Sequence, residues 1–436
     1  MRRLLFTRRN SGTLPATALA VIVAALLVLP TGMPGGGGAA RALEVDDREA
    51  IDDLLARRAI AVLERDRDAF MATVAPYSND FVERQGRLFD AMARLPLESF
   101  GYRVAWERRG DLVRPFDERR YPGAEAVSIP LTEERYRIEG FDRRDAVEDM
   151  YYTYVKSGGR WLIAEDTDLD DITLYSARHL WDFGPLETKR SEHFLQLAPK
   201  CRTDCESVGA DFLDLAERGL ARAQRYWLGP WHPRVVVLVP GSGEQLERMI
   251  QSTFDLENFV AFAYSTVDGA SGVDYTGHRI IPNPRALDGR SSDTVLQILA
   301  HELVHIATRD SAGPFVPIFV DEGFADYAGH DADPGALAFF NSDVAGGLFN
   351  GELPEDFEFT VGSGTDIYRS YQKSQSAVRF FVERFGLGAF NRFYRKLGRV
   401  EIAPGTAAFH IDKAFRATTG LGYERFQEAW TSSIAG

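Results

Sequence analysis

One segment limits the possible folds of this chain sharply: residues 292–308 read SDTVLQILAHELVHIAT. Its apolar side chains recur at helical spacing, at Val295, Ile298, Leu299 and Leu303. Ser292 or Asp293 can cap the start of such a helix. His301 and His305 then lie one turn apart on the same face, because side chains at i and i+4 are neighbours. The fold must therefore bury this helix and keep both imidazoles together.

That face has the residue types and the spacing of a metal site. The two imidazoles can bind one ion, and Glu302 can reach a water molecule beside it without being a ligand. A catalytic zinc needs a third protein ligand and an open fourth position. A second helix-like segment, Val-Asp-Glu-Gly-Phe-Ala-Asp-Tyr, follows Pro317 and offers Glu322 as that ligand. Asp326, one turn later, can accept the N–H of a ligating histidine. The sequence therefore predicts one zinc ion per chain.

These two motifs resemble the zinc motifs of the gluzincin metallopeptidases. His-Glu-Leu-Val-His, followed by Asp-Glu-Gly-Phe-Ala-Asp-Tyr, is most similar to the peptidase MA-like families of that clan. The resemblance covers roughly residues 190–436. It implies that His301, His305 and Glu322 bind zinc. It further implies that Glu302 is the general base and that Asp326 supports a ligand.

A third segment, Tyr371-Gln-Lys-Ser, is expected to open a helix and resembles the Tyr-x-Lys-Gly helix of the clan's aminopeptidases. The resemblance implies that the Tyr371 hydroxyl stabilises an oxyanion. Ser374 replaces the glycine, and Tyr368 is a nearby alternative for this role. The clan's aminopeptidases bind the substrate amine through a glutamate in a Gly-x-Met-Glu-Asn strand. This chain has no glutamate between Glu257 and Glu302, so aminopeptidase activity is not expected.

The chain is expected to have an α+β fold in two parts. Helical spacing over 47–75 and 79–94 precedes strand-like segments between 99 and 175, one of them at 147–156. This order indicates a cone-shaped α+β domain. Tyr-Tyr-Thr-Tyr and Gly-Arg-Trp-Leu-Ile near its end resemble the closing strands of nuclear transport factor 2-like domains, over roughly residues 45–170. This domain is expected to be a scaffold or to position a substrate.

We therefore divide the chain into a signal peptide (1–42), a nuclear transport factor 2-like domain (43–175), a linker (176–192) and a gluzincin-like domain (193–436). The last domain is predicted to be zincin-type, with a small mixed sheet followed by a helical C-terminal half. Its stretch 277–281 is expected to be the edge strand with which a peptide backbone pairs.

The N-terminal segment has the pattern of a secretory signal peptide. It carries four arginines in its first nine residues, then the apolar run 14–29 and the triplet Ala40-Arg41-Ala42. The run has 16 residues, fewer than the roughly 20 that span a bilayer. The sequence therefore predicts a secreted or extracytoplasmic protein, with an N-terminal membrane anchor as the alternative. No stable membrane span is expected once the signal is removed.

The net charge of the chain limits the classes of partner that it can bind. The net charge is −14, and losing the five arginines of residues 1–42 makes it −19. A chain this acidic is not expected to bind nucleic acid.

Cys201 and Cys205 are predicted to form a disulfide, with a zinc site that includes His193 as the alternative. The acidic cluster 166–171 lacks the glycine and terminal glutamate of an EF-hand and is expected to be a solvated turn, not a calcium site. Structural roles are expected for His179, His193, His232, His330 and His410.

The sequence thus predicts a secreted zinc-dependent peptidase, an endopeptidase, that acts on a peptide or protein substrate. One alternative is a zinc-binding but catalytically inactive module that recognises cell-surface or peptide ligands. Another is a zinc hydrolase of a non-peptide amide. The presence of Glu302 favours an enzyme, because a pure binding site needs no general base.

Overall fold

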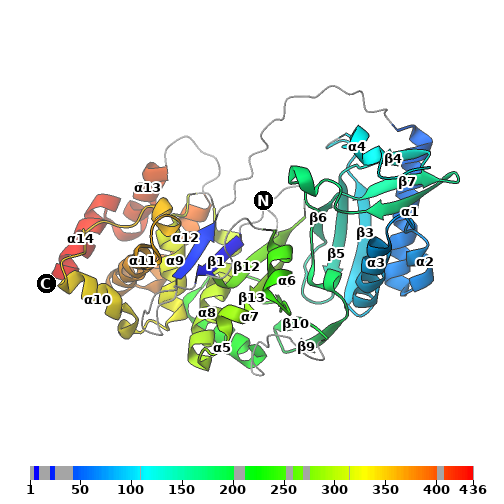
Figure 1. Ribbon diagram of the computed structural model, residues 1–436. Coiled ribbons are helices and arrows are strands. Elements are labelled where there is room, and N and C mark those ends of the chain that lie inside the picture. Colours follow the sequence, from blue (N-terminus) through cyan, green and yellow to red (C-terminus); the bar gives the residue numbers. More distant parts are fainter. Residues whose placement is uncertain are drawn as a thin grey trace.

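The structure, a computed structural model of the chain, describes residues 4–8, 20–24, 43–108, 110–200, 212–251, 259–268, 275–313, 315–399 and 407–435. Figure 1 shows the C-terminal helices at one end, the largest sheet in the middle and the helices and strands of residues 43–175 at the other end. The predicted α+β class with a mixed sheet and a helical C-terminal half is confirmed. Cys201 and Cys205, with their predicted disulfide, lie outside the described residues.

Residues 43–175 form helices followed by two small antiparallel sheets. The helices are α1 Val45–Glu64, α2 Arg67–Met71, α3 Asn79–Met92 and α4 Pro115–Glu118. One sheet has the order β3-β5-β6 (Leu97–Val104, Thr132–Ile138, Ala146–Met150), and the other has the order β4-β7-β8 (Ala126–Ser128, Thr153–Ser157, Arg160–Glu165). The single strand predicted over 147–156 is wrong, because the chain changes sheets at Tyr151 and Tyr152. β6 pairs with β5 in one sheet, and β7 pairs with β4 and β8 in the other, so these two residues link strands of separate sheets.

The acidic turn after β8 is not the solvated turn that the sequence predicts. Asp166 and Asp168 are buried. Asp166 accepts hydrogen bonds from Arg84 and Arg178, at 2.7 and 2.6 Å. Burial opposes ionisation of Asp166, but these two guanidinium groups hold its pKa below the usual range. Asp168 accepts a hydrogen bond from Thr153 at 2.7 Å. These carboxylates therefore link elements of the first part of the chain, because buried charges need paired partners.

The largest sheet has seven strands in the order β2-β1-β12-β13-β11-β10-β9. Their bounds are β1 Leu4–Arg8, β2 Ala20–Ala24, β9 Leu186–Arg190, β10 Phe194–Pro199, β11 Val235–Leu238, β12 Phe259–Val267 and β13 Tyr275–Pro282. β11 pairs in parallel with both β10 and β13, and the other pairs are antiparallel. The helices of this region are α5 Phe212–Tyr226, α6 Gly243–Ile250, α7 Pro284–Leu287 and α8 Ser292–Thr308.

Two features of this sheet differ from the sequence expectations. The segment 176–192, predicted to be a linker, contains a 3-10 helix, η2 (Leu180–Phe183), and the strand β9. In β9 only Leu186 is buried, so the strand has no alternating pattern to recognise. The stretch 277–281 is not an edge strand, because β13 pairs with β11 on one side and β12 on the other. β12 pairs with β1, which lies within the predicted signal peptide.

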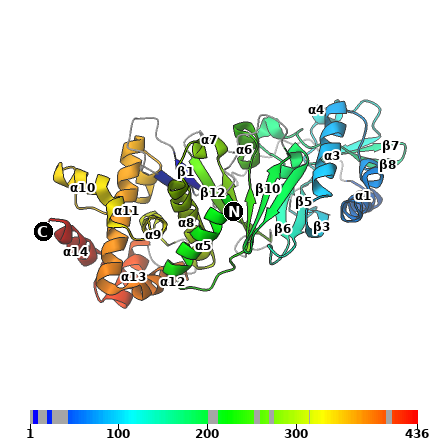
Figure 2. The ribbon, with the colours of Figure 1, turned by 90° about the horizontal axis from the view of Figure 1, so that it is seen from below.

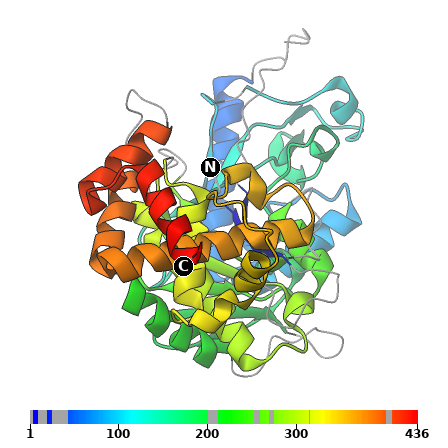
Figure 3. The same ribbon diagram turned by 90° about the vertical axis from the view of Figure 1, so that its left-hand side faces the viewer.

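The C-terminal half consists of helices (Figure 3). They pack around aromatic side chains. They are α9 Ile318–Gly329, α10 Ala338–Ala345, α11 Gly364–Phe385, α12 Leu387–Gly398, α13 Ala407–Thr419 and α14 Tyr423–Ala435. Phe381, Phe390 and Phe393 are buried here. None of the described helices is long and apolar enough to cross a bilayer.

A buried ion pair joins the first part of the chain to the largest sheet. Asp142, in the turn between β5 and β6, accepts two hydrogen bonds from Arg279 of β13, at 2.7 and 2.8 Å. Both side chains are 0% exposed. A Cβ atom at Gly277 would overlap the Asp142 carboxylate, so glycine leaves the space that this contact needs. The neighbouring Arg143 N–H donates to the Thr276 carbonyl at 2.7 Å.

This ion pair predicts a stability difference. Asp142→Ala should lower the free energy of unfolding by about 3–5 kcal/mol, because it leaves the buried guanidinium of Arg279 without its carboxylate. Asp90→Ala is the control, since its pair with Arg67 is 46% and 52% exposed and should contribute about 1 kcal/mol or less. Urea unfolding followed by tryptophan fluorescence measures both. Equal losses in the two variants would contradict this role for Asp142.

Candidate metal centre

The helix α8 places the two predicted histidines inside the protein. It begins after Ser291, and not Ser292 or Asp293, because the Ser291 hydroxyl accepts the Thr294 N–H at 3.2 Å. Figure 2 shows α8 beside α5 and α9. Close approach of α5 requires Gly219, since a Cβ atom there would lie 3.1 Å from the Ala300 nitrogen. Packing on both sides leaves His301 and His305 only 2% and 1% exposed.

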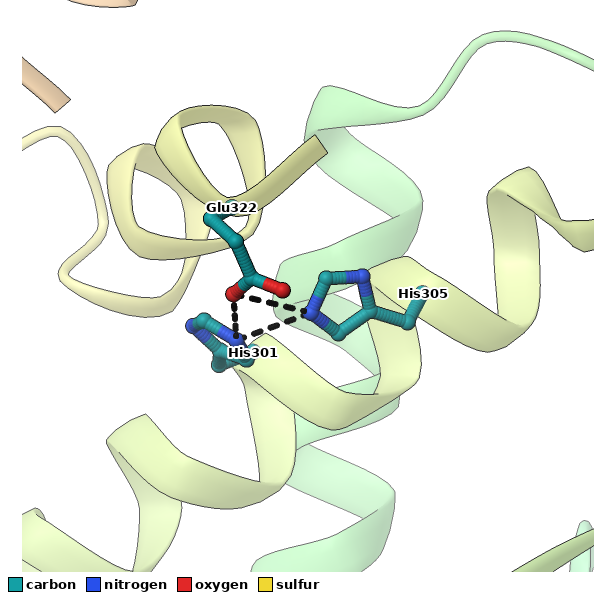
Figure 4. Close-up of side chains that lie close together, drawn as sticks. All are labelled: His301, His305 and Glu322. Atoms are coloured by element: carbon teal, nitrogen blue, oxygen red, sulfur yellow. Dashed lines mark hydrogen bonds and ion pairs between the residues drawn. The ribbon is translucent and has the colours of Figure 1, made fainter. Parts of the chain in front are cut away.

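Glu322 of α9 meets these imidazoles, as Figure 4 shows. The two Nε2 atoms lie 2.9 Å apart. Oε2 of Glu322 lies 3.3 Å from Nε2 of His301 and 3.5 Å from Nε2 of His305. One potential ligand atom from each residue therefore lies within 4.8 Å of the others. The structure brings together the three ligands that the sequence predicts from two separate motifs.

A second carboxylate stands behind each imidazole. Oδ1 of Asp326 lies 2.9 Å from Nδ1 of His301, the position that the sequence predicts for it. Oδ1 of Asp321 lies 3.6 Å from Nδ1 of His305, and the Tyr394 hydroxyl donates to this carboxylate at 2.5 Å. Such partners fix the ring orientation of a ligating histidine and leave Nε2 as the metal-binding atom.

Sequence reasoning assigns no role to Asp321 or Tyr394. Asp321 stands directly before Glu322, so its place within the motif could have suggested it. Tyr394 lies 73 residues later in the chain, on α12, and no spacing or motif points to it. Only the packing of α12 against α9 brings its hydroxyl to the metal centre.

The carboxylates favour positive charge on the imidazoles. Burial opposes charge on His301, but Asp326 and Glu322 outweigh it and raise the pKa to about 9. Burial also opposes charge on His305, and Glu322 and Asp321 raise its pKa to about 10. The same negative surroundings attract a metal cation, whose binding requires neutral imidazoles. A metal ion that binds at this cluster would therefore displace protons, and its affinity would fall as the pH falls.

Glu302 and Tyr371 lie beside the cluster. Both side chains are 0% exposed. Tyr371 lies well inside α11, and not at the start of a helix as the sequence predicts. Burial raises the pKa of Tyr371 well above its usual value, and the charges of Glu322, Asp326 and Glu302 raise it further. The hydroxyl is therefore protonated at neutral pH, and among the described residues it has no hydrogen-bond partner.

Tyr368, the alternative to Tyr371, has different surroundings. Its ring packs against Phe339, with the ring centroids 4.9 Å apart. Burial raises its pKa, and Asp326 is the one site carboxylate that contributes to the rise. The pKa of Tyr371, in contrast, is raised by the charges of both Glu302 and Glu322, so Tyr371 is the tyrosine whose surroundings include these site carboxylates.

Gly323 lets α11 approach α9 closely enough to bring Tyr371 to the site. A Cβ atom at Gly323 would lie 2.5 Å from the Ser374 carbonyl oxygen. Ser374 is itself small and fully buried, and its hydroxyl donates to the Ser370 carbonyl at 2.6 Å. The Ser374 side chain is therefore accommodated without an unsatisfied polar group.

The cluster fits a divalent metal ion. Two imidazoles and one carboxylate are a ligand set found in catalytic zinc sites. Both carboxylate oxygens of Glu322 are buried, and no donor in the described part of the chain is aligned to hydrogen-bond them. Burying such oxygens is unfavourable unless a cation or a donor satisfies them. A zinc ion between the three residues would satisfy them.

The contact behind His301 predicts a change in metal affinity. Asp326→Asn should weaken zinc binding by roughly 10–100-fold, because ligand-supporting carboxylates typically contribute that much. Asp214→Asn is the matched control, since that carboxylate is 71% exposed and lies outside the cluster. Competition with a chelator gives both affinities, and an unchanged affinity in Asp326→Asn would show that the contact does not support the ligand.

The contact between α9 and α11 predicts a packing defect. Gly323→Ala should lower the free energy of unfolding by about 1–3 kcal/mol, the usual effect of inserting a methyl group into a filled space. Gly101→Ala provides the comparison, because nothing lies within 4 Å of a Cβ atom at that position. Thermal unfolding of both variants tests this, and a Gly323 variant as stable as the Gly101 variant would refute the tight contact.

No protein-family model matches the chain, and no curated protein matches it. The function therefore has to be argued from the side chains of the metal centre.

Proposed function

We propose that this protein is a zinc-dependent peptidase, an endopeptidase, that hydrolyses peptide bonds outside the cytoplasm. The observation that carries the proposal is the convergence of His301, His305 and Glu322 next to a buried Glu302 on the same helix. A metal site used only for binding needs the three ligands, whereas the adjacent carboxylate is the group that hydrolysis requires.

His301, His305 and Glu322 would hold the zinc ion, with Asp326 and Asp321 orienting the imidazoles. When bound, a zinc ion supplies Lewis acidity, which makes a water molecule more acidic and polarises a carbonyl group. Three protein ligands leave a fourth position for water or substrate, as in catalytic sites. The ligand set thus supports hydrolysis over a purely structural site, which protein side chains usually close with four ligands.

Glu302 is the proposed general base. Its carboxylate takes a proton from the attacking water and passes the proton to the nitrogen of the leaving amine. Tyr371 is proposed to donate a hydrogen bond to the oxygen of the scissile carbonyl as negative charge develops there. The hydroxyl is suited to this, because its raised pKa keeps it protonated and no described residue occupies it.

The substrate is proposed to be a peptide or a protein. Removal of residues 1–42, as expected of a signal peptide, would leave β12 as the edge of the largest sheet. β12 pairs in antiparallel register with β1, so its outer side accepts an extended backbone. An extended peptide can add to a free edge in the same way.

The proposal also includes the family of each domain, export from the cytoplasm and the class of partner. The two zinc motifs support a gluzincin-type domain, and the helices and antiparallel strands of residues 43–175 suit a nuclear transport factor 2-like scaffold. The arginine-rich start and the apolar run support export. The net charge of −14 disfavours nucleic acid as a partner.

Glu302→Gln tests the mechanism. The substitution keeps the shape of the side chain but removes the proton acceptor, so cleavage should fall by about 10²–10⁴-fold while zinc stays bound. Glu383→Gln is the matched control, on the 59% exposed carboxylate of α11. The measurements are cleavage of a peptide library and zinc content by elemental analysis, on the native chain and both variants.

Native cleavage that survives unchanged in Glu302→Gln would overturn the role of this residue. Stoichiometric zinc in a His301→Ala/His305→Ala double variant would overturn the ligand assignment. A zinc-loaded native protein that cleaves no peptide would favour the alternative of an inactive recognition module, or a hydrolase of another amide.

A further inference from the structure

A second site lies on the other side of α12, away from the metal centre. Between α12 and α13 there is a cavity of about 640 Å³. Six of its lining side chains are basic or titratable: Arg392, Arg395, Lys396 and Arg399 of α12 and the neighbouring turn, and His410 and Lys413 of α13. Among the described residues, no acidic side chain lines it. In a chain with a net charge of −14, such a concentration of positive charge is unexpected.

The positive charges repel one another in this arrangement. Arg392 and Lys396 are four residues apart on one helix, and so are Arg395 and Arg399, which is an unfavourable spacing for like charges. None of Arg392, Lys396 and Arg399 forms an ion pair with a described residue. Arg416, which is on α13 but does not line the cavity, does pair with a carboxylate, Asp412, at 2.6 Å. Among the described residues, these three cations therefore lack the carboxylate partner that Arg416 has.

Helix electrostatics explain only part of this cluster. Arg395 and Lys396 lie in the last turn of α12, where cations interact favourably with the free carbonyl groups. Lys413 and His410 belong to a different helix and face the same cavity. A stabilising effect on the end of α12 does not require cations from α13.

His410 supplies a buried polar atom in the wall of the cavity. The side chain is 7% exposed, and its ring packs against Phe315 with the ring centroids 4.5 Å apart. Its Nε2 atom has no hydrogen-bond partner in the described part of the chain. Buried polar atoms are normally satisfied, so this nitrogen is available to a ligand that enters the cavity.

We propose that this cavity binds a phosphate group carried by a small molecule. A phosphate group offers several charged acceptor oxygens, which match the fixed forks of arginine and the point charge of lysine. The volume is that of an ordinary small-molecule site. The cations line a concave space and not an extended stripe, which fits a compact anion better than a nucleic acid backbone. The site is independent of the proposed peptidase activity.

The test uses the full chain and phosphate-free buffer. Isothermal titration with inorganic pyrophosphate should show saturable binding. The double variant Arg392→Gln/Lys396→Gln should bind about 10- to 100-fold more weakly, since hydrogen bonds to charged groups contribute about that much. Both side chains are exposed, so the fold should be unaffected, and circular dichroism checks this. The control Arg416→Gln/Arg425→Gln removes the same charge outside the cavity and should bind like the native chain.

A second arm separates a soluble ligand from a lipid headgroup. Vesicles of phosphatidylcholine with and without phosphatidic acid are floated with the native chain and both double variants. Binding to phosphatidic acid that is lost in Arg392→Gln/Lys396→Gln, without pyrophosphate binding, would assign the phosphate to a lipid. Pyrophosphate binding lost in the same variant would assign it to a soluble molecule. No binding in either arm, or equal loss in both double variants, would overturn the proposal.

Discussion

The candidate metal centre depends on one buried electrostatic contact, in which Glu322 on α9 meets His301 and His305 on α8. Burying a carboxylate between two imidazoles is unfavourable unless positive charge accompanies it. Here the raised pKa values of the imidazoles, about 9 and about 10, show that protons can supply that charge. Two protons and one divalent ion carry equal charge, so exchanging one for the other leaves the cluster electrically balanced.

The rest of the structure holds these two helices together. Apolar packing drives their burial, and glycines set how closely the neighbours approach. Gly219 lets α5 pack closely against one side of α8, and Gly323 lets α11 pack closely against α9. The imidazoles are then held from behind by Asp326 and Asp321. Packing therefore confines both imidazoles, and a carboxylate stands behind each of them.

The first part of the chain takes part in this organisation. Some of its apolar residues, such as Phe89 and Tyr136, belong to the same buried cluster as those of the largest sheet, and the Asp142–Arg279 pair fixes its turn to β13. β13 is the direct neighbour of β12, the strand proposed to receive a substrate. Residues 43–175 therefore support the sheet next to the metal centre. α12 links two charged regions in a similar way, since Tyr394 contacts Asp321 while its arginines line the basic cavity.

Local sequence determined the parts of the site that helix geometry dictates. The shared face of His301 and His305, and the place of Glu302 beside it, follow from their positions on one helix. Glu322 and Asp326 share a face of another helix for the same reason, because residues i and i+4 are neighbours in any helix. Tertiary structure alone decided the contacts between distant segments. Tyr394 reaches Asp321 across 73 residues, and Arg279 reaches Asp142 across 137. The sequence also could not predict the change of sheets at Tyr151, the place of β9 in the largest sheet or the inner position of β13. Strand pairing and buried ion pairs depend on which distant surfaces meet, and no local periodicity records that.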